Sequence, residues 1–129
     1  MQMRTLLALG ILFAPCPADG HHSFTAEFDS SKPVTLTGVV TRLDWTNPHA
    51  HLYLDVKSES GKVTSWALEL RSPNVLLRQG WTRDLIQPGD VVTVNGFRAR
   101  NGSPFAVVQD VTLTDGRKML LVQRRREDF

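Results

Sequence analysis

The sequence predicts an all-β domain with one short helix. Several short segments rich in Val and Thr alternate apolar and polar residues, which is typical of strands. Turn signals such as Pro88-Gly89-Asp90 and Asn101-Gly102-Ser103 separate these segments. Between the third and fourth segments the pattern changes to that of a helix. This element order is that of the OB-fold, so we expect an OB-fold-like small β-barrel, with a small β-sandwich as the alternative.

The strands can be placed individually. In the first, residues 34–43 alternate in side-chain direction, and Gly38 in the middle suggests a bend or a bulge. In the second, Leu52, Leu54 and Val56 face one way. Strands are expected at residues 33–46, 51–57, 63–70, 91–98, 105–113 and 118–122, after a polar lead-in at residues 23–32.

The single helix follows the third strand. Ser72 is a plausible N-cap, and Pro73 suits the first helical position because its missing N–H has no partner there anyway. Gly80 is expected to end the helix. Trp81 follows directly and should pack against the barrel, while Trp66 alternates with leucines and is expected in the core.

Composition limits the classes of function. A chain of 129 residues has room for one domain. Apolar residues make up 41% and charged residues 22% of it, which is ordinary for a globular protein. The formal net charge of +2 gives no support for specific nucleic-acid binding. The basic run at residues 124–126 is followed by two acidic residues and indicates a solvated end.

The first residues have the pattern of an export signal. Arg4 is followed by an apolar run at residues 6–14, which is too short to span a membrane but fits a signal peptide. We therefore expect a signal peptide at residues 1–20 and a single β-barrel-like domain at 21–129. The mature protein would be periplasmic or secreted and would keep no transmembrane segment.

Two cleavage sites satisfy the small-residue rule. Cleavage after Gly20 would make His21 the first residue, and cleavage after Ala18 would give an Asp19-Gly20-His21 terminus. In either case Cys16, the single cysteine, is removed with the signal. A metal site in the mature protein would then use His, Asp, Glu and backbone groups.

The four histidines fall into two tight groups, His21-His22 and His49-Ala50-His51. In an extended segment the side chains of residues i and i+2 point to the same face, so His49 and His51 could converge on one metal ion. Imidazole is a common ligand of copper and zinc. We therefore expect a metal site built from His21, His22, His49 and His51. Two unrelated histidine pairs are the alternative.

Both cleavage products favour copper. An N-terminal histidine can chelate one metal ion through its α-amine and its ring, and a distant histidine can complete a nitrogen-rich set that suits Cu(II). An Asp-Gly-His terminus offers an amine, two amides and an imidazole, which also suits Cu(II). Asp44, Asp55 or Glu69 could orient an imidazole by a hydrogen bond.

Aromatic residues indicate a second class of function. Trp45 and Tyr53 are candidates for an exposed ligand-binding surface. The alternative to a metal-binding module is thus a non-enzymatic OB-like module that binds a peptide, an oligosaccharide or a partner protein in the periplasm. The sequence shows no nucleophile motif, no phosphate-binding loop and no readable carboxylate pair, so nothing in it supports an enzyme.

The chain also resembles an uncharacterised family of secreted bacterial proteins, a domain of unknown function with an HHSF start and a W-x-N-P-H motif. Here the start is residues 21–24, and the motif is Trp45-Thr46-Asn47-Pro48-His49. The resemblance implies export and a small β fold, and it supplies no activity or cofactor. Ala18-Asp19-Gly20 departs from the Ala-x-Ala pattern that would have fixed His21 as the first residue. Further shared segments are residues 27–29, 32–34, 38–40, 80–81, 88–90 and 115–118.

Overall fold

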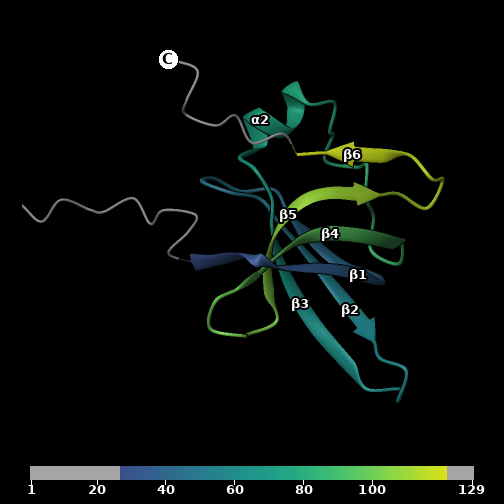
Figure 1. Ribbon diagram of the computed structural model, residues 1–129. Coiled ribbons are helices and arrows are strands. Elements are labelled where there is room, and N and C mark those ends of the chain that lie inside the picture. The colour runs from purple at the N-terminus through teal and green to yellow at the C-terminus, as the bar shows by residue number, and fades with distance from the viewer. Residues whose placement is uncertain (1–26, 122–129) are drawn as a thin grey trace, which may run out of the picture.

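A computed structural model describes residues 27–121 (Figure 1). Within them lie six strands and one α-helix. In chain order these are β1 (Phe28–Asp44), β2 (His51–Lys57), β3 (Val63–Glu69), α2 (Pro73–Arg78), β4 (Val91–Ala99), β5 (Phe105–Thr112) and β6 (Lys118–Leu120).

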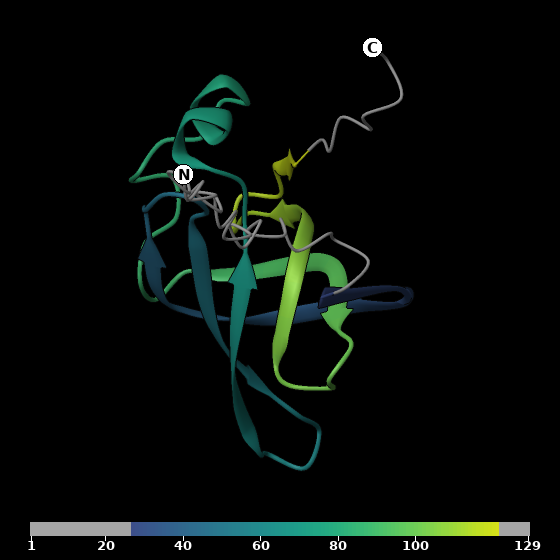
Figure 2. The ribbon, with the colours of Figure 1, turned by 90° about the vertical axis from the view of Figure 1, so that its left-hand side faces the viewer.

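The strands form one sheet whose ends meet. Its order is β3-β2-β1-β4-β5-β6, with antiparallel pairing between neighbours. Strand β3 also pairs with β5 in parallel, and this contact joins five strands into a ring (Figures 1 and 2). The predicted class is confirmed: the fold is all-β with one short helix between β3 and β4, and the ring fits the OB-fold-like barrel. Among residues 27–121, the helix present is too short to cross a membrane.

Strand β1 is longer than the sequence predicts. Its first part, from Phe28 to Val39, pairs with β4, and its last part, from Val39 to Asp44, pairs with β2. Phe28 pairs with Ala99 across a register shift that ends at Pro33. The predicted start at Pro33 was wrong because the polar residues of the shift look like a lead-in, although the strand continues through them.

The core lies inside the ring. The apolar side chains of β2 and β3 that face inward are buried, and Trp66 and Trp81 join them with 7% and 1% of their surface exposed, as predicted. The main cluster contains Leu36, Val40, Ala50, Leu52, Leu54, Trp66, Leu68, Leu70, Leu76, Trp81, Ile86, Val92, Val94, Ala106, Val108, Val111, Leu113 and Leu121.

Helix α2 covers one end of the ring (Figure 1). Pro73 occupies its first turn, and Gly80 has a φ of +87°, which suits the glycine that follows the helix. The predicted N-cap at Ser72 is confirmed, although no side-chain hydrogen bond caps the helix. Ser72 is the N-cap residue, but it contributes its carbonyl oxygen, which accepts a hydrogen bond from the N–H of Leu76.

A second, smaller apolar cluster brings the start of β1 against β4 and β5. Phe28, Ala99 and Val107 are buried in it, and Phe97 and Phe105 pack around them. The rings of Phe28 and Phe105 have centroids 5.3 Å apart. Burial of Phe28 therefore anchors the first residue of β1 against β4 and β5.

The hairpin between β2 and β3 projects from the ring at the end away from α2 (Figure 1). Its tip is closed by backbone hydrogen bonds from Ser58 N–H to the Lys62 carbonyl and from Gly61 N–H to the Ser58 carbonyl. Gly61 supplies the positive φ of this turn.

Two glycines lie where neighbouring backbone comes too close for a side chain. A Cβ at Gly38 would lie 2.6 Å from the carbonyl oxygen of Asp55. The sequence predicts a bend or a bulge at Gly38, and the register shift of β1 against β2 lies between Val40 and Arg42. At Gly96 a Cβ would overlap the carbonyl oxygen of Val107 even more severely.

We predict that Gly96→Ala destabilises the protein by about 3 kcal/mol, since a strand backbone must move to admit the methyl group. Gly102→Ala is the control: its φ of +76° is unfavourable for alanine, but the surrounding space is open, so about 1 kcal/mol is expected. Urea unfolding monitored by tryptophan fluorescence would measure both changes. Equal losses in the two variants would contradict the close approach at Gly96.

We predict that Leu54→Ala lowers the free energy of unfolding by roughly 2–5 kcal/mol, because Leu54 is fully buried and its loss leaves a cavity. Val63→Ala, on a side chain that is 55% exposed, should change it by less than about 0.5 kcal/mol. Thermal unfolding followed by circular dichroism would compare the two variants. Similar melting temperatures for the two variants would contradict the burial of the Leu54 side chain inside the ring.

Candidate functional site

The structure describes four of the six residues that the sequence singles out. Trp45 and His49 lie in the loop between β1 and β2, and His51 and Tyr53 lie on β2. His21 and His22 lie outside the described residues, as does the predicted signal peptide.

His49 and His51 point to the outside of the ring. Ala50 lies between them, is completely buried, and exchanges backbone hydrogen bonds with Leu70 and Arg71. Since side-chain direction alternates along this extended segment, the two histidines flank an inward residue and share the outer face. The loop before them contains a cis peptide bond between Asn47 and Pro48.

Glu69 connects the two histidines. Its Oε1 lies 3.0 Å from Nδ1 of His49, and it is the register partner of His51 across β2 and β3. The side chain of His49 is 49% exposed, whereas that of Glu69 is 15% exposed. The carboxylate thus lies at the base of the site and the imidazole of His49 at its surface. Of the three carboxylates that the sequence offers for orienting a histidine, Glu69 contacts His49.

The surroundings of Glu69 are unusual for a carboxylate. Burial raises its pKa, the negative charge of Glu27 raises it further, and His51 opposes the shift. Four other carboxylates of the described chain pair with Lys or Arg, whereas Glu69 pairs with a histidine. Those conventional pairs are Asp29 with Lys32 and Arg100, Asp44 with Arg42, Asp110 with Lys118, and Asp115 with Arg117.

His51 lies among aromatic rings. Its centroid is 6.4 Å from that of Phe105, with the ring planes 21° apart, and 6.4 Å from that of Tyr53. Sequence spacing gave no sign of Phe105 or Glu27 at this place. Phe105 arrives through the parallel pairing of β3 with β5, and Glu27 arrives through the start of β1.

Tyr53 and Trp45 are both engaged by their own chain. The guanidinium carbon of Arg42 lies 4.1 Å from the centroid of the Tyr53 ring, and Arg42 also pairs with Asp44 at 3.0 Å. Trp45 is half-buried and packs against the main core. Their predicted role in ligand binding stays a prediction.

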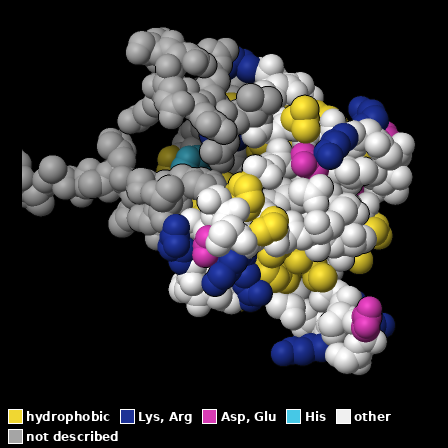
Figure 3. Space-filling view, in the orientation of Figure 1, with side chains coloured by type: hydrophobic (Ala, Val, Ile, Leu, Met, Phe, Trp, Pro, Cys, Tyr) yellow, Lys and Arg dark blue, Asp and Glu magenta, His cyan; other side chains and the backbone are white. Residues whose placement is uncertain are grey.

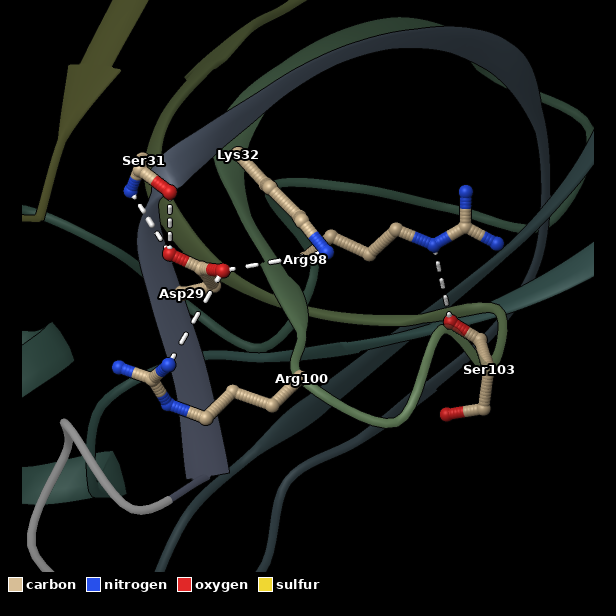
Figure 4. A network of polar contacts seen from close by, with 6 residues as sticks. All are labelled: Asp29, Ser31, Lys32, Arg98, Arg100 and Ser103. Atoms are coloured by element: carbon tan, nitrogen blue, oxygen red, sulfur yellow. Dashed lines mark hydrogen bonds and ion pairs between the residues drawn. The ribbon is translucent and has the colours of Figure 1, made fainter.

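The start of the described chain is held beside this site. The N–H of Arg100 donates to the carbonyl oxygen of Glu27 at 3.0 Å. Asp29 accepts hydrogen bonds from the side chain and the backbone N–H of Ser31, and Lys32 and Arg100 approach its other oxygen (Figure 4). These hydrogen bonds, followed by the two cations, lower the pKa of Asp29.

Arg98 belongs to the same region but serves another purpose. It points away from Asp29, and its Nε donates to the Ser103 carbonyl (Figure 4). Another of its nitrogens donates to the carbonyl of Gly102, and its guanidinium lies 5.1 Å from the Trp66 ring centroid. It therefore holds the loop between β4 and β5.

Elsewhere, the described surface carries interspersed charges (Figure 3) and a shallow cavity. Acidic and basic side chains are interspersed over the face in Figure 3, in keeping with the small net charge. A shallow cavity of about 200 Å³ lies elsewhere, between Leu85 and Arg117, but its Asp115 is already paired with Arg117. Within residues 27–121, no three His, Cys, Asp or Glu side chains are grouped so that they could hold a metal ion.

Comparisons with known proteins agree with the resemblance noted in the sequence. No curated protein matches the chain. Residues 10–108 match a family described as a family of unknown function, DUF6152. The match covers most of the 129 residues, and the chain therefore belongs to this family.

Proposed function

We propose that this protein is an exported, periplasmic copper-binding module whose ligands are His49 and the N-terminal histidines His21 and His22, with His51 on the same face. The observation that carries the proposal is the His49–Glu69 pair. A half-exposed imidazole is held by a mostly buried carboxylate, which is a common arrangement around metal-binding histidines.

The chain path supports a contribution from the N-terminal histidines. The backbone carbonyl of Glu27 accepts a hydrogen bond from the Arg100 N–H, and the charge of Glu27 raises the pKa of Glu69, so Glu27 lies near the site. His22 is five residues before Glu27. A fully extended chain of that length spans at most about 17 Å, so His22 lies within reach of this face. The ligands that residues 27–121 do not supply could therefore come from residues 21 and 22.

The chemistry of the donors favours Cu(II). Imidazole and amine nitrogens suit this ion, and residues 21–129 contain no cysteine that would favour Cu(I). Glu69 and Glu27 add negative charge next to the histidines, which attracts a cation. The alternative, a partner-binding surface built on Trp45 and Tyr53, receives less support because both side chains already contact their own chain.

We predict that the exported and processed protein binds one Cu(II) tightly and that His49→Ala weakens the affinity at least about tenfold, since the ion loses a nitrogen ligand. Isothermal titration would give the affinity, electron paramagnetic resonance the number of coordinating nitrogens, and intact mass the first residue. His21→Ala and His22→Ala should also weaken binding.

Asp55→Asn is the matched control. Asp55 lies on β2, as His51 does, but its carboxylate accepts a hydrogen bond from the Ser65 hydroxyl at 2.6 Å. Its replacement should therefore leave the copper affinity unchanged. Tight binding that ignores His49→Ala would reduce the site to a terminal chelate. The absence of a tight site in the processed protein would overturn the proposal.

Stability measurements can distinguish the contribution of His49, in the loop, from that of His51, on β2. We predict that His49→Ala changes the free energy of unfolding of the metal-free protein by less than about 0.5 kcal/mol, because its ring is half exposed. His51→Ala should lower it by about 1 kcal/mol, because its ring neighbours Phe105 and Tyr53. Urea unfolding without metal would check both values, and a larger loss for His49→Ala would contradict the described positions.

A further inference from the structure

We propose that Glu69 is the positioning residue of the site: it accepts a hydrogen bond from Nδ1 of His49 and leaves Nε2 as the atom that coordinates the metal. The inference rests on the proposed function and adds the atom of coordination and the residue that selects it. Its basis is the 3.0 Å contact between Oε1 and Nδ1.

The tautomer of a neutral histidine follows from its hydrogen bonds. A ring nitrogen that faces a carboxylate keeps its proton, and the other nitrogen keeps a free lone pair. In His49 the nitrogen facing Glu69 is Nδ1, and the ring is half exposed. Nε2 is thus the nitrogen left to bind a cation.

Glu69 itself is poorly placed as a direct ligand of the same ion. Its Oε1 lies 3.0 Å from Nδ1 of His49, whereas the proposed metal-binding atom is Nε2 of the same ring. This agrees with residues 27–121 containing no three-residue metal group. Glu69 therefore acts through His49, in the way that carboxylates behind metal-bound histidines do.

Structural need alone does not account for a carboxylate here. The side chain of Glu69 is only 15% exposed, and its ion-pair partner is the imidazole of His49 rather than a Lys or an Arg. Burying a carboxylate without a permanent cation is unfavourable. Asp44 and Asp110, which flank the same sheet, have Arg42 and Lys118 as partners. A mostly buried carboxylate whose ion-pair partner is a histidine fits the task of orienting that histidine.

The test begins without metal. In the ¹⁵N-labelled, processed protein, nuclear magnetic resonance of the imidazole nitrogens should show His49 mainly protonated at Nδ1. In Glu69→Leu, which removes the acceptor, His49 should shift toward the Nε2-protonated tautomer. In Glu69→Gln, whose amide oxygen can still accept, most of the Nδ1 tautomer should remain. Asp55→Asn serves as the control and should leave the tautomer unchanged.

The same variants are then titrated with Cu(II). Glu69→Leu should weaken binding about 10–100-fold, and Glu69→Gln should weaken it less. An unchanged tautomer and an unchanged affinity in Glu69→Leu, with a native circular dichroism spectrum, would overturn the role of Glu69. If Glu69→Leu fails to fold, the role of Glu69 is tested by Glu69→Gln and by the tautomer of His49 in the parent protein. A His49 protonated at Nε2 in the parent protein would contradict the proposal.

The two proposals fail in different ways. If copper affinity falls in His49→Ala but is unchanged in Glu69→Leu, the proposed metal-binding function stands and the positioning role of Glu69 is overturned. A tautomer that depends on Glu69 in a protein without a tight copper site overturns the function and leaves Glu69 only as the partner of His49.

Discussion

The fold depends on one long strand that pairs with two neighbours in succession. β1 is 17 residues long, and its pairing partner changes from β4 to β2 at Val39, which has a register partner on each side. Because the same strand joins both halves of the sheet, β3 is carried around to meet β5 and the ring can close. At Gly38 and Gly96 the neighbouring strands β2 and β5 leave no room for a side chain.

The outer face inherits its arrangement from that ring. Strand β2 contributes the histidines, β3 contributes Glu69, and the start of β1 returns to the same region through the burial of Phe28. Residues 27, 49 and 69 are distant in the sequence and meet because three strands and one loop converge. Side-chain chemistry at this face is therefore controlled by β-pairing register rather than by a local motif.

Much of the fold could be predicted from the sequence, because each strand has its own alternating pattern and Pro73 and Gly80 mark the two ends of the helix. The inward positions of Trp66 and Trp81 followed from the same patterns. The start of β1 could not be found, since residues 29–32 are polar and hydrogen-bond among themselves. The cap at Ser72 was also predictable, although residue preference does not decide whether its side chain or its carbonyl oxygen makes the bond.

The site was predictable only in part. The alternation around Ala50 places His49 and His51 together, and Glu69 could be named as one of three candidate carboxylates. Choosing among the three required the register of β3 against β2, which places Glu69 opposite His51 while Asp55 lies opposite Ser65. The contributions of Glu27 and Phe105 come from pairings between distant segments, for which spacing carries no signal.

The projecting hairpin tip offers a practical route to observing the outer face. The loop around Ser60 is exposed, closed by its own backbone hydrogen bonds, and located at the end of the ring away from α2 (Figure 1). A fluorophore or spin label attached there would leave the start of the chain unmodified. A tag placed shortly before Glu27, by contrast, would add foreign groups next to the proposed ligands His21 and His22.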